Sequence, residues 1–115
     1  MARNRYYLSI ADLGHARGED PRFSYAGAGP NDFAAALQHA LREDGLFRRW
    51  RAAQPDPDAV DAGLGGTDPA AEVTARVADL RTDVELATTL PMSVLRHRLF
   101  LLIGGGWQLR DLRAA

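Results

Sequence analysis

With 115 residues, of which 46% are hydrophobic and 25% charged, the sequence predicts one globular domain over residues 1–115 and excludes a disordered chain. It contains no cysteine, which excludes disulfides, thiolate zinc sites, iron–sulfur clusters and a cysteine nucleophile. The formal net charge is −1, and no apolar run approaches the ~20 residues that a membrane-spanning helix needs. The N-terminus lacks the features of a signal peptide, so we expect a soluble, cytoplasmic protein.

Charge is distributed unevenly along the chain. Residues 1–54 carry eight arginines against six acidic residues, residues 55–95 carry two against eight, and residues 96–115 carry four against one. The sequence has no lysine, which is typical of the coding bias of a GC-rich, bacterial genome. Two interpretations are open: the three segments neutralise one another in the folded chain, or the segregation attracts a charged partner.

The first predicted element is a strand over residues 5–12, where side chains alternate and aromatic residues are frequent. One set of side chains is expected on the core face, namely Tyr6, Leu8 and Ile10, and the other on the opposite face, namely Tyr7, Ser9 and Ala11. Residues 13–30 contain six glycines and prolines and are predicted to form a long loop. Within this loop, residues 23–25 are candidates for a short edge strand.

Two helices are predicted next. Asn31 or Asp32 is expected to cap the first helix. Its apolar face is marked by side chains at helical spacing, Phe33, Leu37, Ala40 and Leu41. Gly45 is expected to end or kink this helix, because glycine costs about 1 kcal/mol relative to alanine inside a helix. A second short helix is predicted over residues 46–53, and residues 54–69 follow as a loop rich in proline, glycine and aspartate.

Residues 70–90 fit two patterns. A helix across residues 69–80 is one interpretation, because several apolar side chains recur at helical spacing, Val73, Val77, Leu80 and Val84. The alternation from Leu80 to Leu90, with many threonines and valines, favours strands instead. We therefore predict two strands, over residues 72–78 and 81–89, joined by a tight turn or a bulge. The expected turn contains no glycine, proline or asparagine.

A last helix is predicted to begin at Leu90–Pro91, because proline is favoured in the first turn, and to end at the glycines 104–106. Its buried stripe is marked by Leu95, Leu99 and Leu102. A short strand over residues 107–112 completes the order β-α-β-β-α-β. The sequence therefore predicts a two-layer α+β domain with the ferredoxin-like split βαβ order, an extra short helix and long loops over residues 13–30 and 54–69.

The stretch GLFRRWRAAQPDPD, residues 45–58, is the main candidate for a binding segment. On a helix, Leu46, Phe47 and Trp50 share one face by their spacing, so we expect all three in the core. The basic side chains lie away from that face and form the predicted partner-binding patch, Arg48, Arg49 and Arg51. We expect this patch to contact an acidic protein surface, and the 55–68 loop of a second copy is one candidate. Nucleic acid is disfavoured, because the aromatic and basic side chains do not share a surface.

Other motifs lack the specificity of a ligand site. The segment GAGPND, residues 27–32, has an aspartate where a phosphate-binding turn needs its third glycine. The glycines of residues 63–66 and 104–106 are not followed by the Lys-Ser/Thr of a P-loop. The aspartates of the 54–69 loop do not follow the order of a calcium-binding loop. We expect them to form a solvated acidic surface: Asp56, Asp58, Asp61 and Asp68.

The remaining candidates for metal binding or catalysis are isolated. His39 and Glu43 lie one helical turn apart, but one such pair is not a metal site. Neither His15 nor His97 has a partner at metal-ligand spacing. The serines lie outside any nucleophile motif: Ser9, Ser24 and Ser93. We therefore predict no metal, no cofactor and no catalytic residue.

The leading functional hypothesis is a small binding domain that contacts a protein partner or a second copy of itself. The alternative is a small-molecule-binding or enzymatic domain of the same fold, and nucleic-acid binding is the third hypothesis. An exposed sheet face would discriminate among them, because ferredoxin-like RNA binders display aromatic side chains there. Tyr7 is the one candidate of this kind on the first predicted strand.

Overall fold

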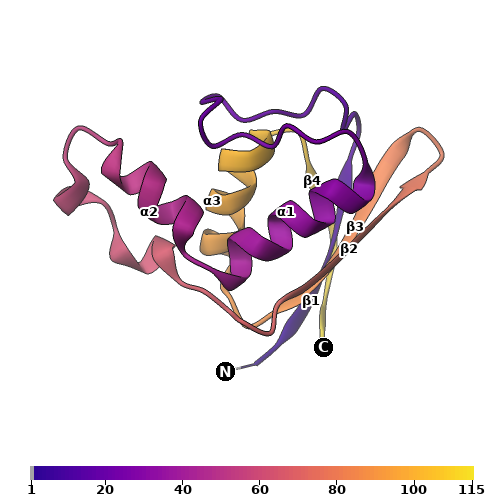
Figure 1. Ribbon diagram of the computed structural model, residues 1–115. Coiled ribbons are helices and arrows are strands. Elements are labelled where there is room, and N and C mark those ends of the chain that lie inside the picture. Colours follow the sequence, from indigo (N-terminus) through magenta and orange to yellow (C-terminus); the bar gives the residue numbers. More distant parts are fainter. Residues whose placement is uncertain (1) are drawn as a thin grey trace.

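A computed structural model describes residues 2–115, which form a four-stranded antiparallel sheet and three α-helices (Figure 1). The strands are β1 (Asn4–Ile10), β2 (Glu72–Ala78), β3 (Arg81–Thr88) and β4 (Gln108–Ala114), and their order in the sheet is β2-β3-β1-β4. The helices are α1 (Pro30–Arg42), α2 (Gly45–Ala52) and α3 (Met92–Ile103), with short 3-10 helices η1 (Pro57–Ala59) and η2 (Ala62–Gly65). Within the described residues, no helix is long and apolar enough to cross a bilayer.

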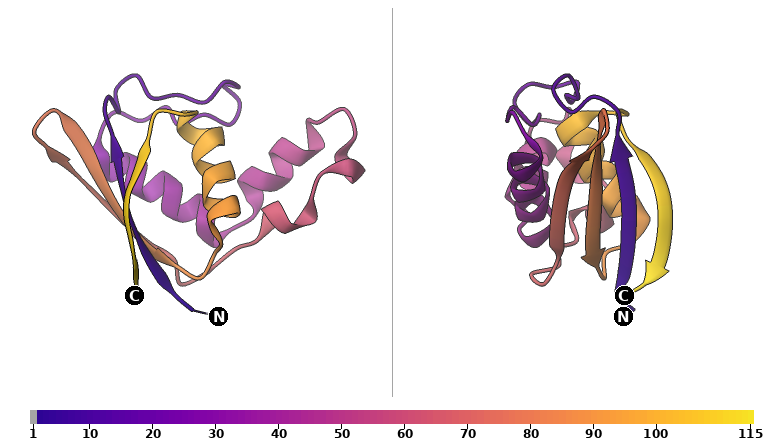
Figure 2. Two further views of the ribbon diagram at one scale, coloured as in Figure 1. Left: turned by 180° about the vertical axis from the view of Figure 1, so that it is seen from behind. Right: turned by 90° about the vertical axis from the view of Figure 1, so that its right-hand side faces the viewer.

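The molecule has two layers, with the helices on one face of the sheet (Figure 2). The alternation in β1 decides which side chains meet the helices: Tyr6, Leu8 and Ile10 are all buried, as predicted. The apolar face predicted for α1 and the leucine stripe predicted for α3 are buried against this side of the sheet. The core therefore lies between the sheet and these two helices, and the prediction of a single α+β domain is confirmed.

The 70–90 segment forms a strand pair and not a helix. β2 and β3 pair antiparallel from Glu72 opposite Ala87 to Ala78 opposite Arg81, which confirms the two predicted strands and removes the helix across residues 69–80. Asp79 in the connecting turn has a backbone φ of 57°. Aspartate adopts this left-handed conformation more readily than most residues, so the turn forms without glycine, proline or asparagine.

The start of α1 differs from its prediction. The helix begins at Pro30 with Gly29 as the N-cap residue, and no side chain caps it, so the expected cap at Asn31 or Asp32 is wrong. The first N–H groups of a helix have no carbonyl partner within the helix. Proline lacks an N–H and has a helical φ, so it is favoured at this position, and the helix starts two residues earlier than a cap at Asn31 would place it.

The loop over residues 13–30 packs across the end of α3 and does not contain the expected edge strand at residues 23–25. Gly18 and Tyr25 both donate backbone hydrogen bonds to the carbonyl of Leu102, at 3.2 and 2.8 Å. Phe23 and Tyr25 are buried at this end of the core. The aromatic residues that suggested a strand therefore anchor a loop. Their side chains are buried by packing against the core, and their backbone does not pair with the sheet.

Candidate binding surface

The face of the sheet opposite the helices is the candidate binding surface. The register places Tyr7 of β1 between Glu85 of β3 and Asp111 of β4, and Thr74 of β2 lies opposite Glu85 on the other side. Tyr7 is therefore the aromatic side chain that β1 presents on this face, as predicted. The charged side chains of the face have both signs: Arg5, Glu72, Arg76, Arg81, Asp83, Glu85, Arg110, Asp111 and Arg113.

A groove of about 710 Å³ crosses this face. All four strands contribute to its lining, which includes Tyr7, Arg76, Asp83, Glu85 and Arg110. Its volume falls in the range of small-molecule sites, about 300–1,000 Å³, but such sites are usually concave cavities lined mainly by apolar side chains. This groove lies on an open sheet face and combines charged side chains with apolar surface, so it fits the surface of another molecule better than an enclosed small ligand.

Charges at the β2 and β3 side of the groove are partly paired. Arg5 lies 3.6 Å from Glu85, and Arg81 lies 2.9 Å from Asp83. These pairs are largely exposed to solvent, so each contributes at most about 1 kcal/mol to stability. Arg76 makes no ion pair with any of the described residues, 2–115. This guanidinium keeps its five donors for a partner.

The β4 side of the groove is organised around a bulge. The pairing of β1 with β4 shifts between Tyr7 and Leu8, so that Arg110 is the extra residue of β4. Its Nε donates to Ser9 Oγ at 2.9 Å, which holds the side chain on the outer face. Arg113 lies over the Tyr7 ring, 5.6 Å from its centroid, and its hydrogen bond to Asp111 lowers the pKa of that carboxyl.

The three arginines predicted as a partner-binding patch have different surroundings in the structure: Arg48, Arg49 and Arg51. Arg48 lies 3.3 Å from Asp44, and Arg49 lines a separate hollow beside the loop over residues 13–30. Arg51 donates to the carbonyl of Pro57 at 2.9 Å and lies 3.9 Å from Asp58. Arg51 thus contacts, within its own chain, the acidic loop that was considered as its target in a second copy.

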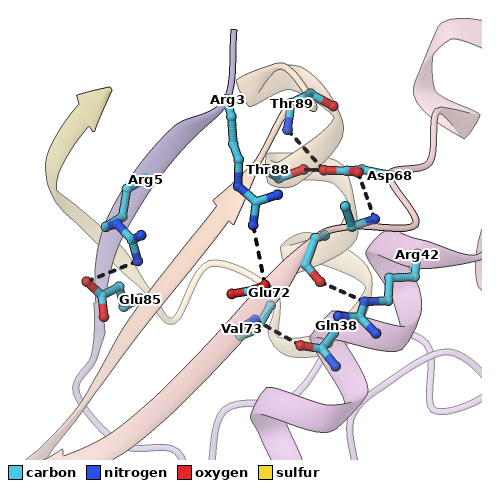
Figure 3. A network of polar contacts seen from close by, with 12 residues as sticks. Arg3, Arg5, Gln38, Arg42, Asp68, Glu72, Val73, Glu85, Thr88 and Thr89 are labelled. Atoms are coloured by element: carbon cyan, nitrogen blue, oxygen red, sulfur yellow. Dashed lines mark hydrogen bonds and ion pairs between the residues drawn. The ribbon is translucent and has the colours of Figure 1, made fainter. Parts of the chain in front are cut away.

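Asp68 corrects the prediction of a solvated acidic loop. It is 7% exposed, whereas Asp56, Asp58 and Asp61 are exposed. Its Oδ2 accepts from Thr88 Oγ1 at 2.8 Å and from Thr89 N at 3.1 Å, as Figure 3 shows. Burial alone would raise the pKa of Asp68, but these hydrogen bonds outweigh it and the pKa lies below its usual range. The hydrogen bonds of Asp68 therefore connect the end of the 54–69 loop to the end of β3.

His97 lies in an aromatic cluster between α2 and α3. Its ring is 4.4 Å from the Trp50 ring and 6.1 Å from the Phe47 ring, measured between centroids. Neither ring nitrogen has a hydrogen-bond partner among the described residues, and burial, followed by the charge of Arg98, lowers the pKa of His97. Phe47 is buried as predicted, whereas Trp50 is half-buried and packs on the outside of the core. The expectation of Trp50 in the core is therefore wrong.

The other two histidines lie in exposed pairs. His15 Nδ1 lies 2.8 Å from Asp12, and His39 Nδ1 lies 2.9 Å from Glu43. In the part of the chain that the structure describes, no three histidine, aspartate or glutamate side chains lie together as metal ligands would. A lone surface pair offers two ligands at most, which is fewer than a protein zinc site uses.

Arg98 is the polar residue that sequence reasoning missed. It is fully buried on α3 and donates to the backbone carbonyls of Ala40, Leu64 and Gly66. Its guanidinium also lies 5.4 Å from the centroid of the Phe47 ring. Burial lowers the pKa of Arg98, and the nearby Asp44 carboxylate acts in the opposite direction. Its position three residues after Leu95, within the buried stripe of α3, was the available signal.

Compared with known proteins, the chain matches no family model, no curated protein and no solved structure. Its class rests on its own architecture: a two-layer α+β domain with helices on one face of an antiparallel sheet and a charged groove on the other.

Proposed function

We propose that the domain has the ferredoxin-like split βαβ arrangement. The support is the direction of its strands. β1 and β2 both pair antiparallel with β3, so they run parallel to each other with β3 between them. In the same way, β3 and β4 both pair antiparallel with β1 and run parallel to each other with β1 between them. Helices connect each parallel pair, so the chain contains two β-α-β units, each split by a strand of the other.

We propose that this domain binds a protein partner with the outer face of its sheet. The observation that supports the proposal is the groove of about 710 Å³ across the strands, with Tyr7 and Arg76 in its lining. Within residues 2–115, the guanidinium of Arg76 makes no ion pair. A rigid sheet presents these side chains at low entropic cost, and tyrosine and arginine are the residues that contribute most at protein interfaces. Charges of both signs suit a protein surface better than a phosphate backbone, which would meet Asp83, Glu85 and Asp111 as well.

The patch of Arg48, Arg49 and Arg51 stays a separate prediction of a protein contact. Arg48 and Arg49 are exposed, whereas Arg51 is half-buried against its own loop. Charges of this kind at an interface rim mainly increase the rate of encounter. We therefore assign binding to the sheet face and keep the patch as a contributor to encounter.

The proposal is tested with a double variant of the groove, Tyr7→Ser with Arg76→Glu, and a matched control, Arg96→Glu, on an exposed position of α3. Partners captured by the wild type from a lysate of the source cells are purified and titrated against all three proteins. We expect a 1:1 complex whose dissociation constant rises about tenfold or more for the double variant, which is about 1.4 kcal/mol, and is unchanged for the control.

Equal binding to all three proteins would exclude the groove. If the binding activity in the lysate is lost on dialysis, the partner is a small molecule. If it is lost after nuclease treatment, the partner is nucleic acid. Both outcomes contradict a protein partner. Unfolding of each variant in urea is measured first, so that a folding defect is not counted as a binding defect.

A further inference from the structure

The two edges of the sheet are not equivalent. At the β2 edge, Gln38 Oε1 accepts the backbone N–H of Val73 at 3.0 Å, and Arg42 Nε donates to the carbonyl of Ala71 at 2.7 Å, as Figure 3 shows. Side chains of α1 thus satisfy backbone groups that a further strand would need. At the β4 edge all seven residues, Gln108–Ala114, are exposed, and Figure 2 shows this strand at the free margin of the sheet. Unpaired strand edges of this kind are templates for pairing with another chain.

The bulge gives β4 a symmetric pattern of faces. Leu109 and Leu112 lie opposite Leu8 and Tyr6 of β1, so both point to the helix side although they are three residues apart. The residues between and around them point to the outer face: Gln108, Arg110, Asp111 and Arg113. From residue 108 to residue 113, the side chains point in turn to the outer face, the helix side, the outer face twice, the helix side and the outer face. This order is the same when the strand is followed in the opposite direction. Directly opposite residues of an antiparallel pair share a face, so two copies of β4 match in one register only, centred between residues 110 and 111.

The chemistry of β4 is symmetric about the same point. In that register Leu109 faces Leu112 of a second copy, Arg110 faces Asp111, and Gln108 faces Arg113. Leu109 is 43% exposed and Leu112 is 50% exposed in a single chain, so pairing them removes apolar surface from water. Opposite charges on directly facing residues stabilise a strand pair, and like charges destabilise it. Face pattern, charge and apolar contact therefore select the same partner, a second copy of this strand.

We propose that the protein forms a symmetric dimer in which the β4 strands of two copies pair antiparallel between residues 108 and 113. A bulge usually discourages edge pairing, because its extra residue disturbs the register. Here the second copy carries the same bulge in the opposite direction and restores the register. Asp111 Oδ2 is held by Arg113 at 2.7 Å and Oδ1 by the N–H of Leu112 at 2.8 Å. A carboxylate has about four acceptor positions, so Arg110 of the partner can be added. The N–H of Leu112, which Asp111 Oδ1 accepts in the single chain, must exchange this carboxylate for a backbone carbonyl of the second copy when the strands pair.

The dimer follows the symmetry that most homo-oligomers use, a two-fold axis with the same patch on both copies. It continues the four-stranded sheet into one of eight strands with both helix layers on the same side. The inference goes beyond the proposed binding function, because it uses the strand edge and does not require a ligand in the groove. One strand pair is a small interface, so the dimer is weak and its population depends on concentration.

Charge exchange tests the register. Arg110→Asp places aspartate opposite Asp111 twice in each dimer, and Asp111→Arg places arginine opposite Arg110 twice. In sedimentation equilibrium at low salt we expect each single variant to raise the dissociation constant about tenfold or more. The double variant, Arg110→Asp with Asp111→Arg, restores both pairs and is expected to dimerise like the wild type. An equimolar mixture of the two single variants is expected to form the heterodimer for the same reason.

Cysteine pairs provide a test that does not depend on charge, because the wild-type chain has no cysteine. Leu109→Cys mixed with Leu112→Cys should form a disulfide between the two chains, since facing residues lie within bonding distance. Each variant alone should cross-link poorly, because identical positions are offset by three residues. A wild type that remains monomeric at millimolar concentration overturns the proposal. So does equal cross-linking in all three samples, or a double charge variant that stays monomeric while folded.

Discussion

At the scale of single residues, the protonation state of His97 is determined by the side chains packed around its ring. Its ring is packed against Trp50 and Phe47, and both ring nitrogens lack a hydrogen-bond partner among the described residues. The adjacent Arg98 is positively charged, so protonation of the ring would place two like charges side by side. The packed state therefore favours the neutral imidazole, and burial is the main cause.

The stability of the protein should consequently depend on pH through His97. The pKa of His97 is lowered in the folded chain, so the unfolded chain binds more protons once the pH falls below the ordinary value of about 6.5. We expect the free energy of unfolding to fall between about pH 7.5 and pH 5.5, by a fraction of the about 1.4 kcal/mol per pH unit of one full proton, because the residue is only partly buried. Measured by urea unfolding at several pH values, the free energy of unfolding of His97→Leu should depend less steeply on pH than that of the wild type. An equal dependence on pH in the two proteins would rule out this role.

At the scale of elements, the region from α2 to η2 depends on the rest of the fold. α2 has eight residues, which is too short for a helix that is stable by itself. Phe47 of α2 packs so closely on η2 that a Cβ atom on Gly65 would lie 2.7 Å from its ring. Arg98 of α3 donates hydrogen bonds to the carbonyls of Leu64 and Gly66 on either side of Gly65. The segment is therefore stabilised by the packing of Phe47 and by the hydrogen bonds of the Arg98 guanidinium, and not by its own helix propensity.

Loss of the Arg98 fork should loosen this segment selectively. Arg98→Met keeps most of the apolar stem but leaves three backbone carbonyls without their donors, and we expect a loss of about 2 kcal/mol or more in the free energy of unfolding. The matched control Arg96→Met, on an exposed position of the same helix, should change it by less than about 0.5 kcal/mol. A protease that cleaves beside aspartate should cut the loop at Asp56, Asp58 or Asp61 faster in Arg98→Met than in the control. Similar cleavage of both would mean that the loop is held by other contacts.

At the scale of the whole molecule, the segregated charges of the sequence meet within the fold. Arg3 lies 3.8 Å from Glu72, Arg5 lies 3.6 Å from Glu85, and Arg51 lies 3.9 Å from Asp58. Each pair joins the basic N-terminal half of the chain to its acidic middle. The structure thus supports the interpretation that the segments neutralise one another, at least for these three pairs.

These pairs should contribute little to stability. They are long and at least partly exposed, and surface pairs of this kind each contribute about 0–1 kcal/mol. Raising the salt concentration from about 0.05 M to about 1 M shortens the screening length to about 3 Å. We expect the free energy of unfolding in urea to change by less than about 1 kcal/mol over this range, with Glu85→Gln as a control that removes one pair. A loss of several kcal/mol would show that the ion pairs, and not the core, hold the segments together.

Local patterns in the sequence determined most of the elements, because period and composition act over a few residues. The alternation of Tyr6, Leu8 and Ile10 identified β1 and its core face, and the threonine-rich alternation after Leu80 identified β3. The helix considered over residues 69–80 competed with β2, which the structure shows as a strand. Helix spacing identified the buried faces of α1 and α3. These features follow from the direction in which consecutive side chains point, which needs no knowledge of distant contacts.

Only the tertiary structure decided the features that depend on residues far apart in the chain. Asp68 reads as one of four loop aspartates, but Thr88 and Thr89, about 20 residues later, bury it. Arg98 reads as an exposed charge until the carbonyls of Ala40, Leu64 and Gly66 surround it. The face pattern of β4 depends on a bulge that exists only in its pairing with β1. Burial, hydrogen-bond partners and strand register are properties of contacts between segments, and periodicity within one segment carries no information about them.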